Sequence, residues 1–171
     1  KYFEKQNHIC CLLDIDVIAI NKISKHLILA KNNKINLVYD LNNKKDRKYN
    51  IKIIKTLKIC NNLDDNQPNW YGGEFIFGNN IFFRTINKKI KYIYPRYIRN
   101  ISKVHHIGDE TIVNSALQII KKEKKIQFKD VSKNKVIARY WSINTKTKQK
   151  DLEYFLKNHF LLHLPGDKVF L

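Results

Sequence analysis

The sequence predicts a mainly β protein: a small β-sandwich or barrel core with an extended N-terminal arm and a C-terminal helix. Three of the five glycines in 171 residues, Gly72, Gly73 and Gly78, fall in one window rich in aromatic and β-branched residues. Such a window is typical of strands that meet at a tight corner. From residue 70 to residue 143, short apolar segments alternate with polar turns, as in a small sandwich or barrel. Near the C-terminus the apolar residues take helical spacing.

Residues 1–69 are predicted to form a partly extended N-terminal extension. There are two apolar stretches, residues 9–20 and 26–39, and the second alternates only in part, which predicts short strands or packed extended chain. Polar segments at 42–50 and 61–69 predict breaks, and the second predicts the entry to a domain. The apolar-basic segment between them, residues 51–60, fits a helix or a strand.

Residues 70–143 are predicted to form the β domain, and residues 144–171 a C-terminal extension. Asp151 is placed to cap a helix over residues 151–163, whose apolar residues share one face, and Pro165 with the following Gly-Asp ends it. The predicted strands of the β domain are residues 74–77, 80–85, 90–94, 111–113, 116–120, 125–129 and 135–142.

The charge balance points to a polyanionic partner. The chain has 33 Lys and Arg against 15 Asp and Glu, a net charge of +18. A field of this sign attracts nucleic acid phosphate above all, and acidic membranes or acidic proteins less often. The cations are mostly Lys spread along the whole length, which suits a large RNA surface better than one DNA groove.

Other residue types offer weaker signals. Three cysteines form no disulfide framework or zinc motif, and no apolar run is long enough to span a bilayer. The histidines lack metal-ligand spacing, so the sequence assigns no metal ligand and no cofactor. Asp14 and Asp16 follow an apolar stretch and could bind Mg²⁺ at a strand end, which is the best indication of an enzyme in the chain.

Three patches in the region 70–143 together indicate a family. The first is Tyr71-Gly72-Gly73-Glu74, followed without a gap by apolar positions that lead to Ile81 and Arg84. The second is Asp109-Glu110-Thr111 with two apolar residues after it, and the third is a basic-apolar strand, a polar turn and a final strand over residues 125–140. In order and rough spacing these patches resemble ribosomal protein L twenty-seven of bacterial-type large subunits.

The resemblance implies a structural constituent of the large subunit of a mitochondrial ribosome, with a plastid ribosome possible. The expected partners are large-subunit rRNA and neighbouring ribosomal proteins, with no small-molecule substrate and no catalysis. A basic insertion, residues 96–106, replaces the family's Gly-rich stretch, and residues 1–68 do not match its N-terminal tail, so no role near the peptidyl-transferase centre is carried over.

The predicted site has two parts. Tyr71, Gly72, Gly73 and Glu74 are expected to form the structural turn. Cations in and beside a basic segment that also carries Tyr and Pro are expected to contact rRNA phosphate. They are Arg84, Lys88, Lys89, Lys91, Arg96, Arg99 and Lys103.

Two alternatives stay open at this point. One is a free RNA-binding or ribosome-assembly factor, which would wash off the large particle in high salt. The other, more remote, is a metal-dependent phosphohydrolase that uses Asp14 and Asp16.

Overall fold

The computed structural model describes residues 8–41, 47–62, 69–141 and 149–165, which form a mixed α/β fold. The mainly β prediction was therefore wrong. In chain order the elements are β1 (Ile9–Leu13), β2 (Val17–Ala19), α1 (Lys25–Asn32), β3 (Asn36–Asp40), α2 (Arg47–Asn61), β4 (Tyr71–Asn79), α3 (Asn80–Arg99), a 3₁₀ turn (Ile101–Lys103), α4 (Asp109–Glu123), β5 (Phe128–Asp130), β6 (Ile137–Arg139), α5 (Leu152–Asn158) and β7 (Leu161–His163).

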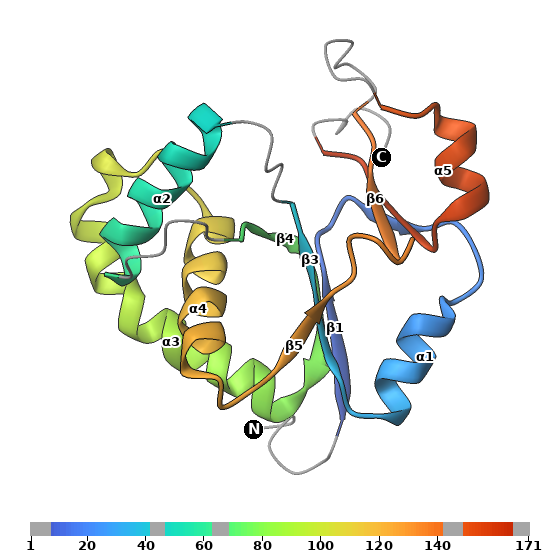
Figure 1. The fold of residues 1–171 in the computed structure, drawn as a ribbon, viewed down its shortest axis with the longest axis horizontal. Coiled ribbons are helices and arrows are strands. Elements are labelled where there is room, and N and C mark those ends of the chain that lie inside the picture. The colour runs from blue at the N-terminus through green and yellow to red at the C-terminus, as the bar shows by residue number, and fades with distance from the viewer. Residues whose placement is uncertain (1–7, 42–46, 63–68, 142–148, 166–171) are drawn as a thin grey trace.

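Two small sheets organise the described residues. The larger has the order β1-β4-β3-β5, in which β4 pairs antiparallel with β1 and β3, and β3 pairs parallel with β5. The smaller has the order β2-β7-β6, with β7 antiparallel to β2 and parallel to β6. Helices α2, α3 and α4 cover one face of the larger sheet, whereas α1, α5 and the smaller sheet lie on the other side (Figure 1).

Strand β4 has apolar cover on both faces, which explains its nearly continuous apolar sequence. Ile76 packs into the cluster formed with α3 and α4, and its neighbours Phe75 and Phe77 pack with Leu27 of α1 and Leu161 of β7. Because β4 lies between β1 and β3, residues from both sides of the proposed boundary at residue 69 share one sheet. Residues 9–40 therefore belong to the folded core and do not form an extended arm.

Helix α3 replaces the two strands predicted at residues 80–85 and 90–94. Its buried side chains are Phe82, Ile86, Ile93 and Tyr97, spaced by four and seven residues, which is the period of one helical face. Asn79 caps it, since its side chain accepts a hydrogen bond from the Phe82 N–H at 2.9 Å. The β-branched and aromatic content favoured strands, but burial of this one face against β4 and α4 decides the outcome.

Helix α4 likewise replaces the strands predicted at residues 111–113 and 116–120. It packs against α3, β4 and α2, so its small and polar side chains are buried together with its apolar ones. Asn114 is fully buried and its side-chain oxygen accepts from the Tyr71 N–H at 2.9 Å, which ties α4 to the start of β4. Because some residues on the buried face of this helix are polar, the helical spacing of its apolar residues is not evident in the sequence.

The remaining elements agree with the sequence to varying extents. Residues 74–77 lie within β4, and residues 51–60 are helical as part of α2. The last predicted helix is shorter than expected, because the chain turns at His159 and residues 161–163 form β7. Asp151 caps α5 as predicted, accepting from the Tyr154 N–H at 2.8 Å. Among the described residues, no helix has the length and apolar character that a membrane crossing requires.

Candidate metal centre

The turn Asp14-Ile15-Asp16 lies where the chain leaves the larger sheet and enters the smaller one. It joins β1 to β2, which belong to different sheets. The Asp14 N–H donates to the Glu74 carbonyl at 3.3 Å, and the Val17 N–H donates to the Asp14 carbonyl at 3.2 Å. These backbone bonds hold the two carboxylates at the junction of the sheets.

His163 reaches the same junction from near the end of the chain. It is the last residue of β7, the central strand of the smaller sheet, where it pairs with Val17. The next residue, Leu164, donates its N–H to the Asp16 carbonyl at 3.1 Å. As a result, His163 Nε2 lies 3.0 Å from Asp16 Oδ1, and ligand atoms of Asp14, Asp16 and His163 all lie within 4.8 Å of one another.

Two buried atoms in this cluster have no hydrogen-bond partner among the described residues: Asp16 Oδ1 and His163 Nδ1. The side chain of His163 is only 3% exposed, and its 3.0 Å approach to Asp16 does not have hydrogen-bond geometry. A buried carboxylate oxygen without a hydrogen bond is costly, and a cation would satisfy it. Carboxylate oxygens suit Mg²⁺ and Mn²⁺, and imidazole is accepted by transition metals, so the donor set fits a divalent cation.

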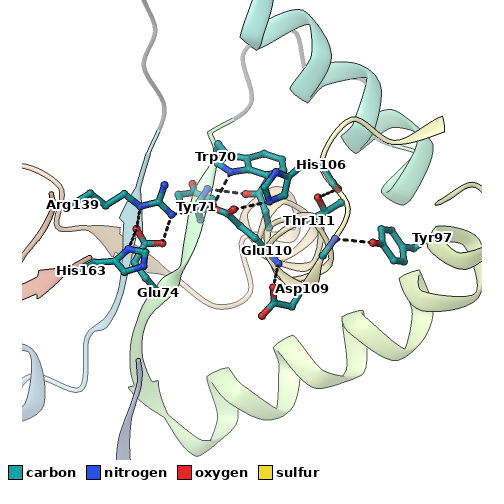
Figure 2. A network of polar contacts seen from close by, with 12 residues as sticks. Trp70, Tyr71, Glu74, Tyr97, His106, Asp109, Glu110, Thr111, Arg139 and His163 are labelled. Atoms are coloured by element: carbon teal, nitrogen blue, oxygen red, sulfur yellow. Dashed lines mark hydrogen bonds and ion pairs between the residues drawn. The ribbon is translucent and has the colours of Figure 1, made fainter. Parts of the chain in front are cut away.

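Glu74 of β4 lies beside His163 and Arg139 (Figure 2), and it faces the ring nitrogen Nδ1, whereas Asp16 faces Nε2. Its carboxylate is fully buried, with Oε1 3.6 Å from His163 Nδ1 and 2.6 Å from Arg139 Nε of β6. Arg139 Nη2 donates to the other oxygen at 3.2 Å. Burial alone would raise the pKa of Glu74, but the contacts with His163 and Arg139 outweigh it and hold that pKa below its usual value.

Gly72 makes room for this carboxylate. It lies two residues before Glu74, on the same face of β4, and a Cβ atom at position 72 would stand 1.8 Å from Glu74 Oε2. The Tyr71-Gly72-Gly73-Glu74 segment predicted as a turn thus forms the first part of β4, and the glycine at 72 serves a close approach and not a corner.

Arg139 connects the cluster to a second carboxylate, Glu110 in the first turn of α4 (Figure 2). Arg139 Nη2 lies 3.5 Å from Glu110 Oε1, and the same oxygen accepts from Trp70 Nε1 at 3.1 Å. The other oxygen lies 3.0 Å from His106 Nε2. A continuous polar network therefore runs from the sheet junction to the start of α4.

Glu110 controls the protonation of His106. The side-chain contact with Glu110 raises the pKa of His106 above its ordinary value of 6.5, against the effect of burial. The contribution of this pair to stability is therefore complete below pH 6.5 and is lost as the pH rises through the folded-state pKa.

Glu110→Gln is expected to lower the pKa of His106, as measured by an NMR titration of its ring protons. Glu123→Gln removes a carboxylate that contacts Lys89 and should leave the His106 titration unchanged. An unchanged pKa in Glu110→Gln would contradict the assignment.

The residues predicted to contact rRNA lie together on α3 and the turn after it. Arg84, Lys88, Lys91, Arg99 and Lys103 are exposed. Lys89 forms an ion pair with Glu123, and Arg96 donates to the side-chain oxygen of Asn62 at 3.3 Å. The structure thus groups these cations on and beside one helix.

Sequence reasoning found Asp14 and Asp16 only as a remote possibility and missed His163. An Asp-x-Asp pair is visible as a motif, but His163 lies far away in the sequence and shares no local pattern with it. Pairing of β2 with β7 is what brings them together. The available signal was a histidine that ends a short apolar run, which is too common to single out a ligand.

Comparison with protein-family models, with curated proteins and with solved structures finds no match to this chain.

Proposed function

We propose that this protein is a metal-dependent glycosyltransferase that uses a nucleoside-diphosphate sugar as donor. The single observation that carries the proposal is the convergence of Asp14, Asp16 and His163, with two of their buried polar atoms lacking any described hydrogen-bond partner. These three residues would hold the divalent cation, and their mixture of oxygen and nitrogen donors suits Mn²⁺ or Mg²⁺.

Three protein ligands support a diphosphate as the group bound with the cation. Mg²⁺ and similar ions favour six ligands and commonly take the rest from substrate phosphates and water. The cation would neutralise negative charge on the departing diphosphate. A net charge of +18 further favours an anionic substrate.

Glycosyl transfer fits the described residues better than phosphoryl transfer that depends on a glycine-rich phosphate loop or on two metal ions. Three of the described glycines lie within β4 and Gly108 precedes the acidic start of α4, so none of them forms a phosphate-cradling loop. Two-metal phosphoryl chemistry also needs further carboxylates around the ions, and the described cluster offers one imidazole in that place. A single cation on a diphosphate leaving group suffices for glycosyl transfer.

The reaction would break the bond between the anomeric carbon and the diphosphate oxygen, whose electron pair leaves with the nucleoside diphosphate. An acceptor hydroxyl oxygen would form the new bond to that carbon and give up its proton to a base. Carboxylates commonly serve as this base or stabilise the positive charge that develops on the sugar. The candidates are Glu110, which Arg139 links to the cation cluster, and its neighbour Asp109 in the first turn of α4.

The proposal is tested by incubating the purified chain with a panel of UDP-, GDP- and dTDP-sugars, with and without Mn²⁺ or Mg²⁺. We expect release of the nucleoside diphosphate from one donor class, dependent on the cation and abolished by EDTA. Calorimetry with the bare nucleoside diphosphates should show binding that requires Mn²⁺. Release of inorganic phosphate from simple phosphate esters would instead favour the phosphohydrolase alternative.

The ribosomal role stays a prediction, as do its mitochondrial location and its rRNA partners. The exposed cations of α3 support contact with RNA, but a lysine-rich helix is a less specific observation than a three-residue metal cluster. If the chain binds no divalent cation and instead binds rRNA with an affinity that falls steeply with salt, the ribosomal role is the better one.

A further inference from the structure

We propose that Glu74 is the positioning residue of the cation site: it orients the His163 ring so that Nε2 faces the cation beside Asp14 and Asp16. The inference rests on the proposed function, because it concerns a ligand of the same site. Ligating histidines commonly present their second ring nitrogen to a carboxylate, which fixes the tautomer and the direction of the ring.

The contacts of His163 divide between its two nitrogens. Nε2 lies 3.0 Å from Asp16 Oδ1, on the cation side, and Nδ1 lies 3.6 Å from Glu74 Oε1, on the opposite side. Nδ1 is buried and has no hydrogen-bond partner among the described residues. A small rotation of the ring would bring Nδ1–H within hydrogen-bond distance of Glu74, and this leaves the Nε2 lone pair for the cation.

The surroundings of Glu74 indicate that its carboxylate is held for this purpose. It is buried in a strand interior, where an ionised group is expensive, and Arg139 clamps both of its oxygens at 2.6 and 3.2 Å. Gly72 leaves the space that the carboxylate occupies. The chain therefore contributes a glycine and an arginine to keep one carboxylate behind the histidine.

A purely structural role for Glu74 gives a different expectation. If Glu74 only neutralised Arg139, then replacing both residues by uncharged ones would restore whatever Glu74→Gln alone had lost. If Glu74 positions His163, the double replacement would restore the stability of the fold but not the affinity for the cation. Neutralisation of Arg139 and positioning of His163 can therefore be distinguished, because fold stability and cation affinity are measured independently.

The experiment measures Mn²⁺ binding, by the EPR signal of the free ion, and urea unfolding for the full chain and three variants. These are Glu74→Gln, the double variant Glu74→Gln/Arg139→Met, and Glu153→Gln, an exposed glutamate paired with Lys157 that serves as the control. We expect Glu74→Gln to bind Mn²⁺ about 10- to 100-fold more weakly. The double variant should unfold close to the wild-type urea concentration yet bind as weakly, and Glu153→Gln should match the wild type.

Wild-type affinity for Mn²⁺ in the double variant would overturn the inference while leaving the cation site in place. Wild-type affinity for Mn²⁺ in Glu74→Gln would likewise overturn the inference about Glu74 without excluding the cation site. If Glu74→Gln does not fold, the double variant carries the comparison alone. If the wild-type chain itself binds Mn²⁺ no better than a variant without Asp16, both the inference and the proposed function are overturned.

Discussion

Replacement of Asp16 by asparagine is expected to weaken Mn²⁺ binding at least about 100-fold, which corresponds to about 2.7 kcal/mol. Asp16 supplies a buried oxygen that no described hydrogen bond satisfies, and the amide removes its negative charge while keeping its size. Because the donor's diphosphate would bind through the cation, release of nucleoside diphosphate should fall at least as far. Binding is measured by EPR of free Mn²⁺, and release by a coupled assay at saturating donor.

Asp151→Asn is the matched control for this variant. It makes the same chemical change at an exposed position that caps α5, where asparagine is as good a cap as aspartate. It should therefore leave both Mn²⁺ binding and product release at wild-type levels. Equal Mn²⁺ affinity in the two variants would exclude Asp16 from the cation site.

Arg139→Met is expected to lower the free energy of unfolding by about 3–5 kcal/mol at neutral pH. The change removes both donors that clamp Glu74 and leaves a fully buried carboxylate without its charge partner. It also removes the contact with Glu110 on α4. The measurement is urea unfolding followed by circular dichroism, with wild type and variant compared at the same pH.

The pH dependence of this loss follows from the lowered pKa of Glu74. In the wild type, the pair stabilises the fold above the unfolded-state pKa of a glutamate, and this stabilisation is lost as the pH falls through the lower folded-state pKa. The difference between wild type and Arg139→Met should therefore shrink on acidification.

Arg99→Met is the control, since it removes a cation from an exposed position at the end of α3. It should change the free energy of unfolding by no more than about 0.5 kcal/mol. A similarly small effect of Arg139→Met would show that Glu74 is not held by that pair.

The prediction of strands within residues 80–99 and 109–123 was wrong because residue composition and hydrophobic periodicity indicate different structures there. Around α3 the Ile, Phe and Tyr residues have strand propensity, while Phe82, Ile86, Ile93 and Tyr97 repeat with a helical period. In α4 the buried Asn114 interrupts the apolar pattern, and its partner is the backbone of a distant strand. Propensity is worth tenths of a kcal/mol per residue, so packing of a whole face overrides it.

The candidate site was visible only in part for a related reason. Asp14 and Asp16 are two residues apart, so the pair is recognisable in the sequence without knowledge of the tertiary structure. Glu74 was noticed within a glycine-rich window, but as part of a turn and not as a buried carboxylate. His163 and Arg139 had no local signal, since their roles depend on β7 and β6 being parallel neighbours with paired ends at these two residues.

By itself, the sequence determined the strong positive charge, the strand character of residues 74–77, the cap at Asp151 and the presence of an Asp-x-Asp pair. These properties depend on composition or on residues close together in the chain. Only the tertiary structure decided that residues 80–99 and 109–123 are helices, and that His163, Glu74 and Arg139 meet behind Asp14 and Asp16. Those outcomes depend on which distant surfaces bury one another and on which distant strands pair within each sheet.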